Sequence, residues 1–264
     1  MANDLIYVYC LLKKLPAGLP GMAQGKLHSI TACGFHVVVK AVSPDEFSEE
    51  NLKKNLSDVQ WLDINAREHI GVIGMLMKQN DVIPFNFGTI FETEENLKKF
   101  ITEYSGSLSD NLEYISGKEE WSIKIYCNLK VITEQIDELS TEAADLEKQI
   151  MASSPGKAFL LKRKKADLIE NELNRLLKIY GQEYFNEIRD LSEDTTLNNL
   201  LPKELTGRED SMILNAAFLV LKEKSDVLTS VLASLQKKYQ HLGLNSEVSG
   251  PWPPYSFVAI KENH

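Results

Sequence analysis

Side chains that could carry out catalysis or bind a metal are few in this sequence and lie far apart. No two histidines or cysteines have the short spacing by which one helix or loop presents a pair of metal ligands. The chain also lacks a Gly-x-Ser-x-Gly nucleophile elbow, a phosphate-binding P-loop and a Gly-x-Gly-x-x-Gly dinucleotide motif. The sequence therefore predicts no catalytic residue, no metal site and no bound cofactor. The scattered residues are His28, His36, His69, His241 and His264, with Cys10, Cys33 and Cys127.

Arg67-Glu68-His69 is the strongest polar candidate in the first half of the chain. On a helix, these residues could present a base or a ligand. They could also form hydrogen bonds or ion pairs to a neighbouring strand, because buried polar groups in proteins are generally hydrogen-bonded. We expect the second, structural role.

The stretch Pro84-Phe85-Asn86-Phe87-Gly88-Thr89 has a phenylalanine at every second position. In a strand, Phe85 and Phe87 would share one face. Pro84 would restrict that strand to an edge or place a bulge there. A partner could dock at such an edge, but core packing by the two phenylalanines is the simpler interpretation.

Lys162-Arg163-Lys164-Lys165 is the densest basic run. Four consecutive residues of a helix point in different directions, so a solvated face is the simplest interpretation. The alternative is contact with an acidic partner or a phosphate surface. Lys162, Arg163 and Lys165 are therefore the candidate interaction residues.

Composition narrows the class of protein. The 264 residues carry a net charge of −9, which argues against broad nucleic-acid binding, since that needs a positive surface field. The apolar run Met212–Leu221 is shorter than the ~20 residues of a membrane span, and Met1–Lys14 lacks the positive start of a signal peptide. An odd number of distant cysteines favours reduced thiols and a cytoplasmic location.

Residues 1–117 are predicted to form an α+β domain. Strong β-formers, breakers and capping residues mark its elements. A loop rich in serine and glycine is expected around Ser105–Asp110. The other expected elements are strands at Leu5–Leu12, Leu27–Cys33, Phe35–Val42 and Val82–Phe91, a turn-rich loop at Pro16–Gly21, and helices over Ser48–Gln79 and from Thr93 to about Tyr104.

Residues 118–264 are predicted to form a second α+β domain with the ferredoxin-like order β-α-β-β-α-β. Apolar residues at 4-3-4-3-4 spacing from Ile132 to Ile150 predict one amphipathic helix. With the next helix it would form an added helical hairpin, whose apolar seam could serve recognition or be used inside the hairpin. The other expected elements are strands at Trp121–Asn128, Thr195–Leu201 and Met212–Leu221, and helices over Pro155–Ile188 and Ser225–Leu242. A last strand is expected over Asn245–Gly250 and Tyr255–Ala259, broken by the proline cluster between them.

Two tryptophans, Trp61 and Trp252, lie in segments that otherwise carry polar or breaker residues. We expect both side chains to be buried and structural. Trp252 belongs to the unusual string Gly250-Pro-Trp-Pro-Pro-Tyr-Ser-Phe257, a stiff aromatic segment that could cover a sheet or display a ligand-like surface. We expect the first role.

Several of these strings, in this order and spacing, resemble the gas vesicle GvpF/GvpL family over nearly the whole chain. Where family members often carry Leu-Arg-Phe-Gly-Thr, this chain has Phe85-Asn86-Phe87-Gly88-Thr89, so Asn86 supplies no charge at that position. The strings are Tyr7-Val8-Tyr9, Phe47 after Val42-Ser43, Trp61 with Ala66-Arg67-Glu68-His69, Val82–Phe91, Glu120-Trp121-Ser122-Ile123-Lys124, Pro155-Gly156-Lys157-Ala158-Phe159-Leu160 and Gly250–Tyr255.

The resemblance implies a two-domain α+β accessory protein without catalysis. Such a protein would take part in vesicle assembly by binding the gas vesicle shell subunit and other accessory proteins. It would bind no nucleic acid, would not insert into a membrane, and would be cytoplasmic and associated with gas vesicles. The alternative is an enzyme or small-ligand-binding protein that uses the ferredoxin-like domain, because such sheets also host catalytic sites.

Overall fold

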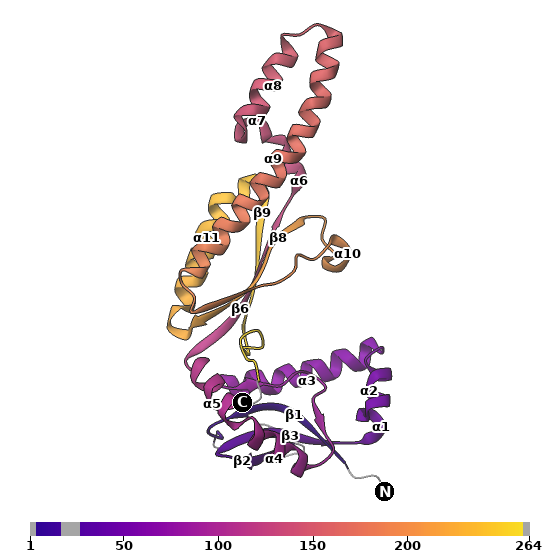
Figure 1. Ribbon diagram of the computed structural model, residues 1–264, viewed down its shortest axis with the longest axis vertical. Helices are drawn as coiled ribbons and strands as arrows, with labels where there is room; N and C mark the ends of the chain where they lie inside the picture. The colour runs from indigo at the N-terminus through magenta and orange to yellow at the C-terminus, as the bar shows by residue number, and fades with distance from the viewer. Residues whose placement is uncertain (1–3, 17–26, 261–264) are drawn as a thin grey trace. The chain divides into compact units, whose positions relative to one another are not determined.

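The computed structural model describes residues 4–16 and 27–260, which form two compact units (Figure 1). Unit 1 comprises the described residues up to Glu120 and those from Pro251 onward, and unit 2 is Trp121–Gly250. The chain thus enters unit 2 close to the predicted 117/118 boundary but returns to unit 1 at Pro251, which the sequence did not indicate. Independent folding of the two units stays a prediction. Apart from Pro16, the expected loop Pro16–Gly21 lies outside the described residues.

Unit 1 is a sheet between two layers of helices (Figure 1). The strand order is β2-β3-β1, with β4 and β5 both pairing with β1. The elements are β1 (Leu5–Leu12), β2 (Leu27–Ala32), β3 (Phe35–Val42), α1 (Pro44–Phe47), α2 (Glu49–Asn55), α3 (Val59–Met77), β4 (Ile83–Pro84), β5 (Ile90–Phe91), α4 (Glu94–Glu103) and α5 (Ser105–Tyr114).

The central strand β1 supplies side chains to both cores, and a bulge changes which core each residue enters. Up to the bulge, Ile6 and Val8 face the core under α4 and α5, whereas Tyr7 and Tyr9 face the core under α3. The pairing register with β3 shifts between Val8 and Cys10, so the alternation restarts by one position. Thereafter Leu11 joins the first core and Cys10 the second.

Two predictions in unit 1 are wrong. Val82–Phe91 is not one strand, because Phe85–Thr89 forms a loop in which Gly88 takes a positive φ of 80°. As a result, Phe85 and Phe87 enter opposite cores instead of sharing a face. The expected loop around Ser105–Asp110 is helix α5, since burial of Leu108 and Leu112 against the sheet outweighs the weak helix propensity of its serines and glycine.

Unit 2 has the sheet order β7-β8-β6-β9, which confirms the ferredoxin-like prediction. Helices α9 and α11 cover one face, and α9 approaches so closely that a Cβ on Gly181 would lie 2.8 Å from the Ile213 carbonyl oxygen. The elements are β6 (Lys118–Cys127), α6 (Leu129–Glu134), α7 (Ile136–Leu139), α8 (Thr141–Met151), α9 (Pro155–Arg189), β7 (Asp194–Leu197), α10 (Lys203–Thr206), β8 (Ser211–Leu221), η2 (Lys222–Lys224), α11 (Ser225–Tyr239), η3 (Gln240–Leu242) and β9 (Leu244–Trp252).

The predicted hairpin exists, but its first arm is not a single helix. The backbone breaks at Gln135 and again at Ser140, where extended φ and ψ angles separate α7 from α8. Ser140 then caps α8 by accepting a hydrogen bond from the Ala143 amide. Figure 1 shows α8 and the start of α9 extending beyond the sheet of their unit. None of the helices in the described part of the chain combines the length and apolar character needed to cross a bilayer.

Candidate functional site

His69, the best sequence candidate for a base or ligand, is locked into the core of unit 1. Its side chain is buried, with Nδ1 2.9 Å from the Tyr7 hydroxyl and Nε2 3.0 Å from the Phe85 carbonyl oxygen. Tyr9 stacks on the imidazole at a centroid distance of 5.6 Å. Burial lowers the pKa of His69 and raises that of Tyr7. Both groups are therefore held neutral, as a structural hydrogen-bond network requires.

The two other residues of this motif point elsewhere. Glu68 accepts a hydrogen bond from the Tyr9 hydroxyl and pairs with Lys40 at 2.7 Å. Arg67 lies on the surface and pairs with Asp63, one turn earlier on α3. The expected structural bonds to neighbouring strands are therefore made by His69 and Glu68, whereas Arg67 pairs within its own helix and not with a strand.

The C-terminal segment after Gly250 is fastened to unit 1 through the same cluster. The Tyr255 hydroxyl lies 3.1 Å from His69 Nε2. Ser256 donates from its amide and its hydroxyl to the buried Glu120 carboxylate, at 2.8 and 2.7 Å. The Ala259 amide donates to Asn111. The second part of the predicted last strand, Tyr255–Ala259, is wrong. The amides of Tyr255 and Phe257 form turn hydrogen bonds to the carbonyl oxygens of Pro253 and Pro254, and side chains accept from the amides of Ser256 and Ala259.

The tryptophan predictions have different outcomes. Trp61 is half-buried and packs against Phe47 and Phe87, with ring centroids 5.3 and 6.3 Å away. Trp252 is 36% exposed, whereas the prolines that follow it are buried. The expected burial of Trp252 is therefore wrong.

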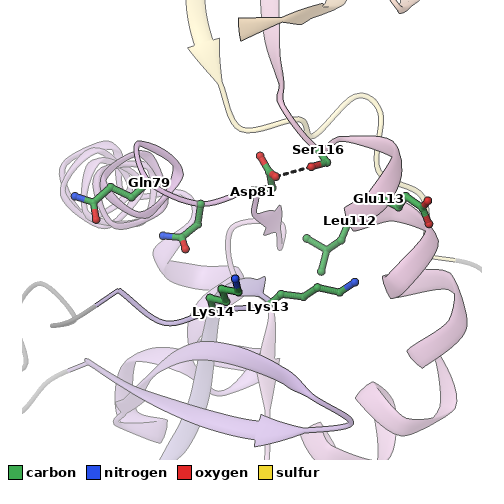
Figure 2. A pocket seen from close by; sticks show the side chains of 8 residues that line it. Lys13, Lys14, Gln79, Asp81, Leu112, Glu113 and Ser116 are labelled. Carbon is green, nitrogen blue, oxygen red and sulfur yellow. Dashed lines mark hydrogen bonds between the residues drawn. The ribbon is translucent and has the colours of Figure 1, made fainter.

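A cavity of about 600 Å³ in unit 1 has mixed charge (Figure 2). Lys13 and Lys14 lie on one wall and Glu113 on another. Asp81 is already bound, since its carboxylate accepts from the Ser116 hydroxyl at 2.8 Å and from the Gly117 amide at 3.2 Å. Across the described residues, His, Cys, Asp and Glu form no group of three that could hold a metal. The side chains that line this cavity therefore do not favour one chemical class of ligand.

The seam of the hairpin is used within unit 2. Ala143, Leu146 and Ile150 of α8 are buried. Lys165 of α9 reaches across to Asp137 at 2.7 Å and to Glu147 at 2.9 Å, and its side chain is 13% exposed. Of the three candidate interaction residues, Lys165 thus binds inside the hairpin, whereas Lys162 and Arg163 are exposed.

The end of the hairpin carries exposed apolar side chains beside these two basic residues. Met151 is 78% exposed, Phe159 71% and Leu160 67%. Lys162 and Arg163 follow Phe159 by three and four residues on α9, so the three side chains are neighbours on one helix face. We call Met151, Phe159, Leu160, Lys162 and Arg163 the hairpin tip. Single exposed apolar residues are ordinary, but three large ones at the end of α8 and near the start of α9 make the hairpin tip a candidate contact surface.

Sequence reasoning identified the basic half of the hairpin tip and missed the apolar half. The signal was present, because Pro155-Gly156-Lys157-Ala158-Phe159-Leu160 is one of the strings that carry the family resemblance.

Comparison with known proteins identifies relatives along the whole chain. The family model described as "Gas vesicle synthesis protein GvpL/GvpF" matches residues 5–259. "Gas vesicle protein L" of Streptomyces sp. (strain CB03234) is 24% identical over 267 residues, covering 99% of this chain and 96% of that protein. "Gas vesicle protein L1" of Halobacterium salinarum (strain ATCC 700922 / JCM 11081 / NRC-1) is 26% identical over 182 residues, covering 67% of this chain and 63% of that protein.

A solved structure shares the fold. The crystal structure of the gas vesicle protein GvpF from Anabaena sp. PCC7120 superposes with a TM-score of 0.71 at 18% identity. The match covers 98% of this chain and 100% of that one.

Proposed function

Because the chain belongs to the GvpL/GvpF family of gas vesicle synthesis proteins, we propose that it acts in gas vesicle formation as a non-enzymatic accessory protein. It binds the vesicle shell subunit and fellow accessory proteins, and it works in the cytoplasm in association with gas vesicles. The family match over 5–259 carries this proposal.

The hairpin tip supports a binding role. It combines apolar area, which gains free energy on burial at roughly 25 cal/mol per Å², with two cationic side chains that favour an acidic neighbour. The apolar seam between the two arms of the hairpin is already filled by intramolecular contacts. These contacts hold the side chains of the hairpin tip on a rigid hairpin. Preorganisation of this kind lowers the entropic cost of binding.

The test is complementation in a bacterial host that carries a complete gas vesicle gene cluster from which only this gene is deleted. Vesicles are counted by electron microscopy and by the turbidity lost on pressure collapse. Wild-type chain is expected to restore vesicles, and the double variants Phe159→Ser/Leu160→Ser and Lys162→Glu/Arg163→Glu to restore fewer at equal protein level. Lys178→Glu, at an exposed lysine of the same helix, is the matched control and should restore them fully.

Each outcome bears on a separate part of the proposal. Undiminished vesicles in the deletion strain would overturn the function itself. Full rescue by both tip variants would leave the function standing and remove the tip as the binding surface. Co-purification of the tagged chain with the shell subunit, lost in the tip variants, would identify the direct partner.

A further inference from the structure

A second cavity in unit 1, of about 420 Å³, lies where α1 and α2 meet the β1–β5 edge of the sheet. Its apolar lining comes from Leu5, Phe47, Leu52 and Ile90. Gly88 also lines it, and a Cβ there would lie 3.4 Å from Leu52 Cδ2. The glycine that the loop needs for its positive φ of 80° thus also leaves this space open.

Two carboxylates line the same cavity from different elements. Glu49 belongs to the first turn of α2, and Glu92 directly follows β5. Asp45 and Glu46 in the first turn of α1 and Glu50 beside Glu49 extend the negative surface, and all three are exposed. Glu49 pairs with Lys53 at 2.7 Å, but with side chains 86% and 73% exposed this pair can exchange partners at little cost.

We propose that this cavity, separate from the hairpin tip, binds a segment of a partner protein in which a large apolar side chain is flanked by lysine or arginine. The apolar side chain fills the space between Leu5, Phe47, Leu52 and Ile90. The flanking cations lie against Glu49 and Glu92. The negative rim excludes nucleic acid and anionic lipid as occupants, because both would be repelled by the same carboxylates.

The test uses labelled acetylated peptides with the full-length chain. The probe peptide has leucine between two lysines in a glycine–serine background. One matched peptide has serine in place of leucine, and another has glutamates in place of the lysines. Fluorescence anisotropy measures binding, and heteronuclear NMR locates it through shifts of the amides of 47–52 and 88–92.

The protein variants are Glu49→Lys/Glu92→Lys and, as a control at exposed carboxylates that do not line the cavity or belong to its negative surface, Glu95→Lys/Asp110→Lys. Circular dichroism confirms that both remain folded. We expect saturable binding of the leucine probe with Kd below about 1 mM and an affinity about tenfold lower for the lining variant. The control variant should bind within about twofold of wild type.

Three results would overturn the proposal. They are the absence of saturable binding, equal binding of the serine and leucine peptides, and an equal loss of affinity in the control variant. Equal binding of the serine and leucine peptides would show that charge alone attracts the probe. An equal loss of affinity in the control variant would show that the overall negative charge of the protein, and not the cavity, attracts it. None of these results bears on vesicle formation, so failure here is distinguishable from failure of the hairpin tip.

Discussion

The hydroxyl of Tyr255 lies 3.1 Å from Nε2 of His69, although 186 positions separate the two residues. The Phe85 carbonyl oxygen, 3.0 Å from the same nitrogen, can only accept a hydrogen bond, so Nε2 carries the hydrogen. Nδ1 is then the acceptor for the Tyr7 hydroxyl. One neutral imidazole thus connects β1, the loop after β4 and the returning C-terminal segment.

His69→Gln is expected to remove a pH-dependent part of the stability of unit 1. Burial lowers the pKa of His69 from its ordinary value of 6.5, so the unfolded chain binds a proton that the folded chain resists. The stability contributed by the neutral side chain is present above about pH 6.5 and is lost as the pH falls from there toward the lower pKa of the folded state. The free energy of unfolding changes by at most ~1.4 kcal/mol per pH unit in this range. Urea unfolding between pH 8 and 5 measures it.

The comparison between wild type and variant isolates His69, because the other titrating groups are shared. At pH 8 the variant should be less stable by roughly 1–3 kcal/mol, since the Tyr7 hydroxyl loses its buried acceptor. Toward pH 5 the two curves should converge. Parallel pH profiles would contradict the neutral, buried state of His69. The raised pKa of Glu120, caused by burial, has the opposite sign: its contribution grows as pH falls, equally in both proteins.

Loosening the C-terminal segment should destabilise unit 1 although the changed residues lie near the end of the chain. Tyr255→Phe/Ser256→Ala removes the hydroxyl facing His69 and one of two hydrogen bonds to the buried Glu120 carboxylate. We expect a loss of roughly 2–4 kcal/mol, with faster hydrogen exchange in unit 1. Tyr114→Phe, at a 40% exposed tyrosine, is the control. Unchanged exchange in unit 1 would show that the segment does not contribute to its stability.

Elements set by local sequence patterns could be predicted from the sequence, whereas a segment placed by long-range side-chain bonds could not. The β1–β3 strands and the βαββαβ order of unit 2 follow from local alternation and β-propensity, which the residues themselves carry. The return of Pro251 onward to unit 1 rests on bonds such as Tyr255 to His69 and Ser256 to Glu120. The sequence around Tyr255 and Ser256 contains no pattern that identifies their bonding partners. The return of this segment to unit 1 could therefore not be predicted from local sequence.

In the hairpin, too, the local spacing of apolar residues predicts burial but not the contacts between the two arms. The 4-3-4-3-4 spacing from Ile132 to Ile150 predicts an apolar side whose residues are buried, apart from Leu139, which is partly buried, because each short helix keeps that side inward. It cannot reveal the break at Ser140, where a side-chain cap competes with helix continuation. It cannot place Lys165 either, because Asp137 and Glu147 meet it only once two arms have folded together.

Gly181→Ala should be costly, whereas Gly71→Ala should not. A Cβ at Gly181 would approach the Ile213 carbonyl oxygen to 2.8 Å, so α9 would have to move away from β8. Overpacking of this kind costs ~1–3 kcal/mol. At Gly71 in α3 an added Cβ meets no atom within 4 Å, and alanine should stabilise the helix by ~0.5–1 kcal/mol. Thermal unfolding of both variants measures the contrast, and a neutral Gly181→Ala would mean that this contact has room to relax.

Lys165→Met and Lys162→Met should separate the structural lysine of the hairpin from the surface lysine. Burial lowers the pKa of Lys165, but the hydrogen bonds and charges of Asp137 and Glu147 together outweigh it and leave that pKa raised. The stability from this raised pKa is fully present below the unfolded value of 10.5 and is lost only as pH rises through the folded pKa. At pH 7, Lys165→Met should therefore cost ~1 kcal/mol, a modest value because both carboxylates remain partly solvated.

The loss should appear locally, as faster hydrogen exchange in α7 and α8, whereas Lys162→Met should change stability by less than ~0.5 kcal/mol. In the complementation assay the order should reverse, because the exposed Lys162 belongs to the hairpin tip and Lys165 faces inward. Equal exchange rates in the two variants would show that the Lys165 bridge does not hold the arms together. A vesicle defect confined to Lys165→Met would show that bracing of the hairpin, rather than its tip, limits assembly.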